Sequence, residues 1–310
     1  MNEFKNQHLL DVLESHRMHH IADKMEKYFV KRDEVKTELQ AKYGNKLVVR
    51  AINSGSYAKC TAINTKFDID ICQPFKRDSF TTLEKMADDV YDFFKNEYED
   101  DDLIEVKKQR VSTGIIFLID DEEVPMDVTP GRELEEGGYK DDQYLKLYVR
   151  AKGDKPATQT QTNISKHIDL IKGKTQERRI IRLLKIWKNK HSPNIKSFFM
   201  ELITIKAFEA NSSNLPKDQW GKLEMTMKYI KDNVKTIELI DPANSTNIVS
   251  NTMTDSEKQQ LAEDMDNALI QIEHNEKRIS YYFPVNEEFA EKEEKSSIKK
   301  SSVIPTVHFS

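Results

Sequence analysis

The N-terminal half of the chain contains short apolar runs in which hydrophobic and polar positions alternate. Runs of this kind, rich in β-branched residues, are typical of half-buried strands. Two of these runs, 114–119 and 124–129, flank a short acidic segment and therefore predict a hairpin. Strands are expected at 47–52, 67–71, 104–111, 114–119 and 124–129.

A different pattern, with apolar residues three and four positions apart, predicts helices. It occurs at 8–43, as one long or two short helices, at 81–98, and almost continuously from Ile164 onward. These patterns together predict an α+β fold, with a mixed sheet of about four or five strands joined to a helical domain. The boundary is expected between 163 and 164, which gives domains 1–163, with its N-terminal helix, and 164–310. Helices of the second domain are expected at 177–190, 197–209, 220–234 and 256–276, and the Glu, Lys and Ser content of 286–302 predicts weak order.

Two aspartates lie in the second predicted strand, at Asp68 and Asp70. Side chains alternate along a strand, so both carboxylates point to the same face. Carboxylates held this close repel each other unless a cation lies between them. Upstream, Gly55 and Ser56 form a predicted turn whose backbone N–H groups and hydroxyl suit a phosphate. The stretch predicts a metal-dependent nucleotide site.

A third acid, Asp127, lies between Met126 and Val128 in the second arm of the predicted hairpin. A lone Asp-x-Asp pair is usually a solvated turn, but the Gly-Ser turn and Asp127 favour a functional site here. Oxygen ligands suit Mg²⁺, with Mn²⁺ as a possible substitute. Two such ions held by the three acids would activate a hydroxyl and neutralise a leaving pyrophosphate.

Composition narrows the class of ligand. Charged residues make up 33% of the chain, the mean hydropathy is -0.71, and no apolar run approaches the ~20 residues of a transmembrane helix. The N-terminal residues lack the apolar core of a signal peptide, so a cytoplasmic location without membrane association is expected. A net charge of -5 argues against bulk binding to duplex nucleic acid and favours nucleotides as ligands.

Cysteine and histidine offer weaker signals. Cys60 and Cys72 lack a Cys-x-x-Cys partner, so neither a disulfide framework nor a zinc site is indicated, and both are expected to be small core residues. His16 and His20 have the i, i+4 spacing of metal ligands, although two exposed imidazoles on a helix explain the spacing more simply.

The second domain supplies a possible phosphate corner. Ser197 opens a helix that is apolar on nearly all sides, and Lys185 lies on the preceding helix. A helix N-terminus, a hydroxyl and a lysine together suit an anion. Taken singly, these two residues also fit an ordinary N-cap and a lysine that lies along the surface.

Two segments resemble a known enzyme superfamily. Gly55-Ser56, Asp68-Ile-Asp70 and Asp127 resemble the signature of the polymerase-β-like nucleotidyltransferases. The segments 182–188, 197–203 and 207–209 are similar to the helical half of oligoadenylate synthases and cyclic GMP-AMP synthases. The combination resembles the CD-NTases, the bacterial members of that branch, over roughly 47–247.

The resemblance implies a bilobed enzyme whose central cleft joins nucleoside triphosphates, with a purine preference, into a cyclic oligonucleotide. It implies that the product signals anti-phage defence to a separately encoded effector. Asp68, Asp70 and Asp127 would bind metal, with Asp127 nearest the attacking 3′-hydroxyl. Nucleotide contacts would come from Gly55 and Ser56, from Lys185 and Ser197 on the triphosphate, and from Phe198, which replaces the frequent Tyr, as a base-stacking ring. The zinc-ribbon insertion of the animal DNA sensors is absent, so activation by duplex DNA is not expected.

Two alternatives remain open at this point. One is an enzyme of related chemistry, a linear 2′-5′ synthase or a tRNA-adding transferase. The other is a non-catalytic nucleotide-sensing module that kept the fold, although the presence of all three acids argues against it.

Overall fold

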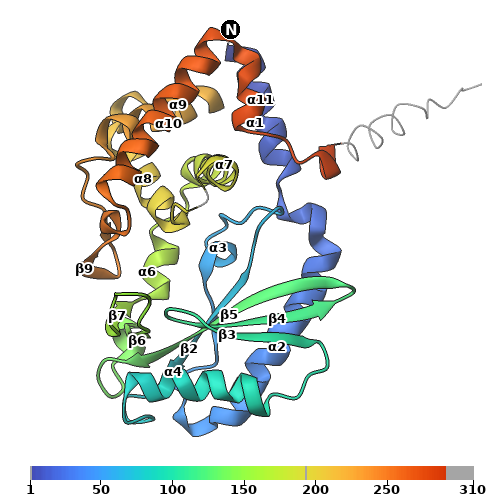
Figure 1. The fold of residues 1–310 in the computed structure, drawn as a ribbon, viewed down its shortest axis with the longest axis vertical. Helices are drawn as coiled ribbons and strands as arrows, with labels where there is room; N and C mark the ends of the chain where they lie inside the picture. The colour runs from blue at the N-terminus through green and yellow to red at the C-terminus, as the bar shows by residue number, and fades with distance from the viewer. Residues whose placement is uncertain (1, 193, 291–310) are drawn as a thin grey trace, which may run out of the picture.

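The computed structural model describes residues 2–192 and 194–290. A mixed sheet with its helices forms one end of the molecule and a bundle of helices forms the other (Figure 1). This arrangement confirms the predicted α+β class. Within the described residues, the first end contains helices α2 (Ala22–Tyr43), α3 (Gly55–Ala58), α4 (Leu83–Asp92) and α5 (Tyr139–Asp142), and strands β1 (Ile52–Asn53), β2 (Ile69–Phe75), β3 (Leu103–Lys108), β4 (Thr113–Ile119), β5 (Glu122–Glu133), β6 (Leu145–Val149) and β7 (Thr158–Thr162).

The bundle is built mostly from the second half of the chain. Its described helices are α1 (Asn2–Ser15), α6 (Ile164–Asp169), α7 (Thr175–His191), α8 (Ser197–Ala210), α9 (Gln219–Asn233), α10 (Asp255–His274) and α11 (Ile279–Tyr282), and β8 (Ile240–Asp241) pairs with β9 (Asn244–Ile248) in a small hairpin. The 8–43 region is therefore two helices, α1 and α2, separated by a 3-10 turn at Met18–Ile21.

The main sheet has the strand order β1-β2-β5-β4-β3, and β6 and β7 extend it from the far end of β5. The β2–β5 pair is parallel and the other pairs are antiparallel, so the sheet is mixed as predicted. The β4–β5 hairpin closes through Asp120 and Asp121, which both have positive φ angles. Short acidic side chains tolerate this conformation better than most residues, which explains the acidic turn.

The edge of the sheet differs from the sequence prediction. A strand was expected over 47–52, but only Ile52–Asn53 pairs with β2, and Leu47 makes an isolated bridge to Phe75. Pro74 of β2 has no N–H to donate to a neighbouring strand. The side-chain amide of Gln73 donates instead to the backbone oxygen of Val49, over 2.9 Å. The ladder is interrupted at this point, and β1 is short.

Two further strands were not predicted. β6 and β7 form an antiparallel hairpin that brings the described sheet to seven strands rather than four or five. β7 reads Thr-Gln-Thr-Gln-Thr and contains no apolar residue. Hydrophobic alternation therefore could not reveal it.

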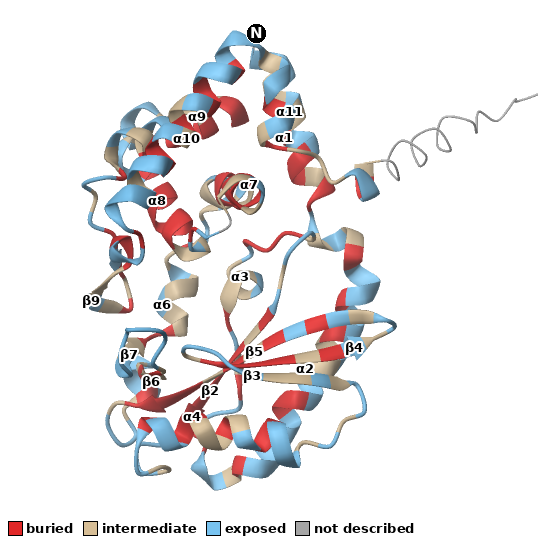
Figure 2. Cartoon of the chain, viewed as in Figure 1, coloured by how far each residue is buried: buried red, intermediate tan, exposed pale blue. Residues whose placement is uncertain are grey.

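Buried hydrophobic residues form two large clusters, one in the bundle and one around the sheet, and Figure 2 shows buried positions at both ends of the molecule. Leu9, Val12 and Leu13 of α1 belong to the core of the bundle, together with α7 and α9. α1 therefore packs on the helical part although it precedes the sheet in the chain. The division at 163 and 164 stays a prediction.

Three further expectations from the sequence concern the two cysteines, membrane-spanning helices and the segment 286–302. Cys72 is buried as expected, but Cys60 is exposed, so it is not a core residue. No helix in the described part of the chain is long and apolar enough to span a membrane. The weak order predicted for 286–302 falls mostly on residues 291–310, which lie outside the described residues.

Candidate active site

Three aspartates meet at one end of the parallel strand pair. Asp70 and Asp127 are direct partners in the β2–β5 register, and Asp68 lies two residues before Asp70, just ahead of β2. One carboxylate oxygen of each residue lies within 4.8 Å of the others. The structure thus brings together the three acids predicted from sequence, which we call the acidic triad.

Gly55 is in direct contact with this group. Its φ angle is +68°, and a Cβ atom built on it would lie 1.6 Å from Oδ2 of Asp70. Any side chain at this position would displace the carboxylate. Gly55 and Ser56 form the first residues of the single helical turn α3, as part of the predicted turn after the short strand.

The three carboxylates of the acidic triad carry like charges and repel one another. The pKa of Asp70 is raised to about 7, mainly by burial and also by the nearby carboxylates of Asp68 and Asp127. Burial also raises the pKa of Asp127 to about 6, with a smaller contribution from Asp68. A divalent cation would relieve this repulsion, and three convergent carboxylate oxygens are the donor set that Mg²⁺ or Mn²⁺ prefers. The residues therefore fit the expected metal.

Asp127 is oriented by a residue that sequence reasoning missed. The side-chain Nε2 of Gln109 donates to Asp127 Oδ1 over 2.7 Å. Gly114, opposite Asp127 in the β4–β5 register, leaves room for this contact, because a Cβ there would lie 2.5 Å from Gln109 Nε2. The hydrogen bond occupies one oxygen of Asp127 and leaves the other available to a ligand.

A cavity of about 470 Å³ opens beside the acidic triad. Its volume falls in the range of small-molecule sites. Both parts of the molecule line it, which agrees with the central cleft that the resemblance implies. The lining residues are Ser56, Lys59, Thr61, Ala62, Ile63, Lys66, Phe67, Asp68, Asp70 and Pro125 from the N-terminal part, and Lys185, Lys188, Asn189, Ser197, Phe198 and Glu201 from α7 and α8.

Lys185 lies in this cavity, but its ammonium group already has partners. Its Nζ lies 3.1 Å from a carboxylate oxygen of Glu201 and donates to the hydroxyl of Thr61 over 2.9 Å. Glu201 also pairs with Lys59 over 2.5 Å. Burial alone would raise the pKa of Glu201, but the two lysines outweigh it and hold the pKa below its usual range. These four residues form a buried network, which we call the Glu201 network.

Ser197 and Phe198 both face the cavity at the start of α8. The N-cap of α8 is Lys196 rather than Ser197, and no side chain caps the helix. The ring of Phe198 packs near the imidazole of His167, with centroids 5.0 Å apart, and Lys59 Nζ lies 5.3 Å from its centre. Phe198 therefore lies beside the cavity, and its stacking on a base stays a prediction.

Three residues at the site, Glu201, Lys59 and Gln109, were not predicted from the sequence, and the sequence pattern points to some of them more clearly than to others. Glu201 lies between Met200 and Leu202 in the most apolar stretch of α8, and a buried acid in such a setting calls for a cationic partner. Lys59 lies three residues after Ser56, close to the predicted turn. Nothing in the sequence around Gln109 distinguishes it from other polar loop residues.

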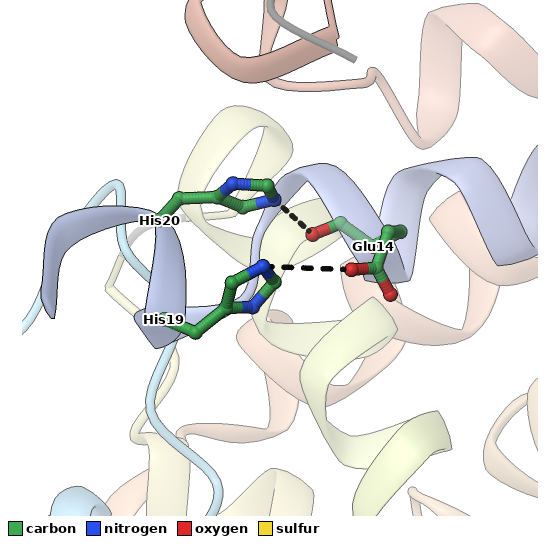
Figure 3. A group of neighbouring side chains, drawn as sticks. All are labelled: Glu14, His19 and His20. Atoms are coloured by element: carbon green, nitrogen blue, oxygen red, sulfur yellow. Dashed lines mark hydrogen bonds and ion pairs between the residues drawn. The ribbon is translucent and has the colours of Figure 1, made fainter. Parts of the chain in front are cut away.

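A second group in the described residues also has metal-compatible geometry. Figure 3 shows His19 and His20 directed toward Glu14, with His20 Nε2 3.0 Å from the backbone oxygen of Glu14 and His19 Nε2 3.8 Å from its carboxylate. Arg17 already pairs with that carboxylate over 2.7 Å, and its charge opposes a bound cation. The acidic triad is therefore the better match for a metal.

The spacing of His16 and His20 does not form a metal site. His16 is buried, and its Nδ1 lies 2.9 Å from the backbone oxygen of Val12. The two histidines do not share a helix, because His16 lies in the turn after α1 and His20 lies in the 3-10 turn Met18–Ile21.

Comparison with known proteins gives structural matches only. Neither a protein-family model nor a curated protein matches the sequence. The structure of E. coli MS115-1 CdnC with ATP aligns with a TM-score of 0.62 and 20% identity, over 85% of this chain and 88% of that one. Vibrio cholerae DncV, a cyclic AMP-GMP synthase described as a prokaryotic cGAS homolog, aligns with a TM-score of 0.57 and 13% identity, over 76% of this chain and 68% of that one. The chain has the CD-NTase fold.

A third CD-NTase structure supports the same conclusion. Elizabethkingia meningoseptica CdnE, a cyclic dinucleotide synthase solved with GTP and Apcpp, aligns with a TM-score of 0.53 and 16% identity, over 76% of this chain and 90% of that one. The shared fold confirms the fold class predicted from sequence and agrees with the fold that the resemblance implies. At these identities the alignment concerns the fold, and the chemistry depends on the site itself.

Proposed function

We propose that this chain is a metal-dependent nucleotidyltransferase that joins two or three nucleoside triphosphates into a cyclic oligonucleotide and releases pyrophosphate. The observation that carries the proposal is the acidic triad at the edge of a lysine-lined cavity. CD-NTase-fold neighbours described as cyclic dinucleotide synthases support it.

Asp68, Asp70 and Asp127 would hold two Mg²⁺ or Mn²⁺ ions, which would polarise the reacting phosphate and the attacking hydroxyl. In the reaction, a 3′-hydroxyl oxygen of one nucleotide bonds to the α-phosphorus of another. The bond from that phosphorus to the α,β-bridging oxygen breaks, and pyrophosphate leaves. Asp127, whose second oxygen is not used by Gln109, takes up the hydroxyl proton.

The cavity residues divide between the two ends of the nucleotide. Gly55 and Ser56 lie beside the acidic triad, and Lys185 and Ser197, which line the cavity, would contact the triphosphate. Phe198 stacks on the base without offering the hydrogen bond of a tyrosine. ATP and GTP in the neighbouring structures support purines as substrates. We extend the proposal to anti-phage signalling through a separately encoded effector, in the cytoplasm.

The test is to incubate the purified protein with all four nucleoside triphosphates and Mg²⁺ or Mn²⁺ and to identify the product by mass. A phosphatase-resistant oligonucleotide is expected, whereas a phosphatase-sensitive product would indicate a linear synthase. The double variant Asp68→Asn with Asp70→Asn should lose pyrophosphate release by at least about a hundredfold. Unchanged release in that variant would overturn the assignment of the site.

A further inference from the structure

A hollow of about 600 Å³ lies along one side of α2 and shares no lining residue with the cavity beside the acidic triad. It is open to solvent at Val30, which is 56% exposed, and at Tyr57, which is 38% exposed. An apolar groove with a polar rim is a typical interaction site. We call this surface the α2 groove, and its lining residues are Met18, His19, Ala22, Met25, Glu26, Phe29, Val30, Asp33 and Tyr57.

The α2 groove touches the turn that supports the acidic triad. Tyr57 follows Ser56 in α3, and Ser56 lines the cavity beside the triad. The ring of Tyr57 packs edge-on against Phe29 of α2, with centroids 4.9 Å apart. Gly55, the first residue of α3, is in direct contact with Asp70. A ligand in the α2 groove would therefore contact the same helical turn that adjoins Asp70.

The last described residues lie beside one end of the α2 groove. Phe289 is buried in the same hydrophobic cluster as Ile21 and Met25, and its ring stacks on His20 with centroids 4.9 Å apart. His19, the neighbour of His20, lines the groove. Figure 1 shows these last residues, in red, next to the beginning of α2. The chain therefore continues from a position that adjoins the groove.

The residues that follow have a composition that complements the α2 groove. Residues 295–310 contain three lysines and no Asp or Glu, whereas Glu26 and Asp33 of the groove are exposed acids. Pro305 disfavours a helix, so this stretch would bind in an extended conformation. Its apolar residues are concentrated towards the end and are Ile298, Val303, Ile304, Val307 and Phe309.

The lengths of the segment and the groove also match. Seven extended residues, 303–309, span roughly 23 Å. The groove from Met18 to Asp33 extends over roughly 22 Å along the helix axis. Residues 291–302, which connect the segment to the described chain, can span up to about 40 Å. The apolar segment can therefore reach every part of the groove.

We propose that residues 303–309 occupy the α2 groove of their own chain, with Lys299 and Lys300 facing the acids Glu26 and Asp33, and that this contact restrains α3. Burial of the apolar side chains of the segment against the exposed side of α2 drives the contact. The inference does not rest on the proposed function, because the groove lies outside the cavity and the contact involves no nucleotide.

The test uses photocrosslinking in the full chain. The photoreactive residue p-benzoylphenylalanine replaces Val30 or, as a matched control, Ile270, which is 52% exposed on α10 and lies outside the groove. Linked peptides are identified by mass at two protein concentrations. Position 30 should link to 303–309 within a single chain at both concentrations, and position 270 should not. Links only between two chains, or equal links from both positions, would overturn the proposal, as would no link to 303–309.

Substitutions in the segment test the apolar contact itself. Ile304→Asp with Val307→Asp should lower the yield of the link from position 30 at least about fivefold, because two carboxylates replace side chains buried beside acids. Ser296→Asp with Ser297→Asp adds the same charge ahead of the segment and should change the yield less than about twofold. Urea unfolding verifies that each variant keeps its fold. An unchanged yield in the first variant would refute the contact.

Hydrogen exchange measures the restraint on α3. In the Ile304→Asp, Val307→Asp protein without the photoreactive residue, the backbone amides of α3 should exchange about threefold faster or more than in wild type, whereas those of α10 should not change. Equal exchange of the α3 amides in the two proteins would overturn the restraint.

Discussion

Gly55 is the position at which the backbone and the acidic triad constrain each other most closely. Its positive φ angle already favours glycine, and the carboxylate of Asp70 fills the space that a side chain would need. The conformation of the turn and the position of one metal-binding acid are therefore linked through a single residue.

Gly55→Ala should abolish product formation, because the new methyl group displaces Asp70. Gly137→Ala is the matched control, since its φ of +73° is similar but nothing lies within 4 Å of its Cβ position. The control should lose only about 1 kcal/mol of unfolding free energy from backbone strain and keep its activity. The measurements are pyrophosphate release and urea unfolding. Equal activity in the two variants would contradict the described contact.

Asp70 should make the metal-free protein less stable as pH rises. Its pKa is about 7 in the folded state against an ordinary value of 3.8, so the folded protein resists losing this proton. Stability is lost between pH 4 and pH 7 and stays lower above that range. Asp70→Asn removes the effect and should stabilise the protein at pH 8, but not at pH 4, by on the order of 2 kcal/mol.

Urea unfolding in EDTA at pH 4 and pH 8 measures this difference. Asp101→Asn, at an exposed aspartate in the turn before β3, is the control and should change little at either pH. Mg²⁺ at pH 8 should stabilise the wild-type protein and not the Asp70→Asn variant. A variant that is equally stable relative to wild type at both pH values would refute the raised pKa.

At the scale of elements, helices and strands with a regular spacing of hydrophobic residues could be predicted from the sequence. Strands without such a spacing, such as β7, could not. The β4–β5 hairpin was predicted because 114–119 and 124–129 are mostly apolar and flank an acidic turn. β7 was missed because hydrogen bonds to β6, rather than burial, define it. The strand at 47–52 was overestimated because Pro74 interrupts a ladder that the apolar run alone would favour.

The acidic triad could be predicted for a related reason. Asp70 and Asp127 are acids among apolar neighbours, and such positions are rare without a function. Gln109, Lys59 and Glu201 act through contacts made only in the folded chain, between residues far apart in sequence. Pairing of this kind leaves no local pattern in the sequence. Only the structure could show that the charge of Lys185 is balanced by the carboxylate of Glu201.

At the scale of the whole molecule, the Glu201 network connects the two parts across the cavity. Lys59 and Thr61 come from the loop after α3, whereas Lys185 and Glu201 come from α7 and α8. All four side chains lie at the junction and line the cavity. Their pairing therefore fixes how the bundle meets the sheet.

Glu201→Gln should destabilise the protein by about 3–5 kcal/mol, because it leaves two lysines without their buried partner. Glu201 is 3% exposed and bonds to both parts of the molecule. Glu209→Gln is the control on the same helix, since it breaks only an exposed pair with Lys206 and should cost less than about 1 kcal/mol. Urea unfolding free energies are compared. Similar losses in the two variants would show that the network does not join the parts.

The parallel register of β2 and β5 also determines which changes in chain length the site tolerates. Asp70 and Asp127 face each other on neighbouring strands, and the intervening chain returns through α4 and the β4–β5 hairpin. Residues added in the exposed turn before β3 would leave this pairing unchanged. One residue added within β5 ahead of Asp127 would shift its side chain to the opposite face of the sheet. The number of residues in the loops between Asp70 and Asp127 is therefore free to vary. The number of residues in β5 ahead of Asp127 is not, because a change by one turns the Asp127 side chain away from Asp70.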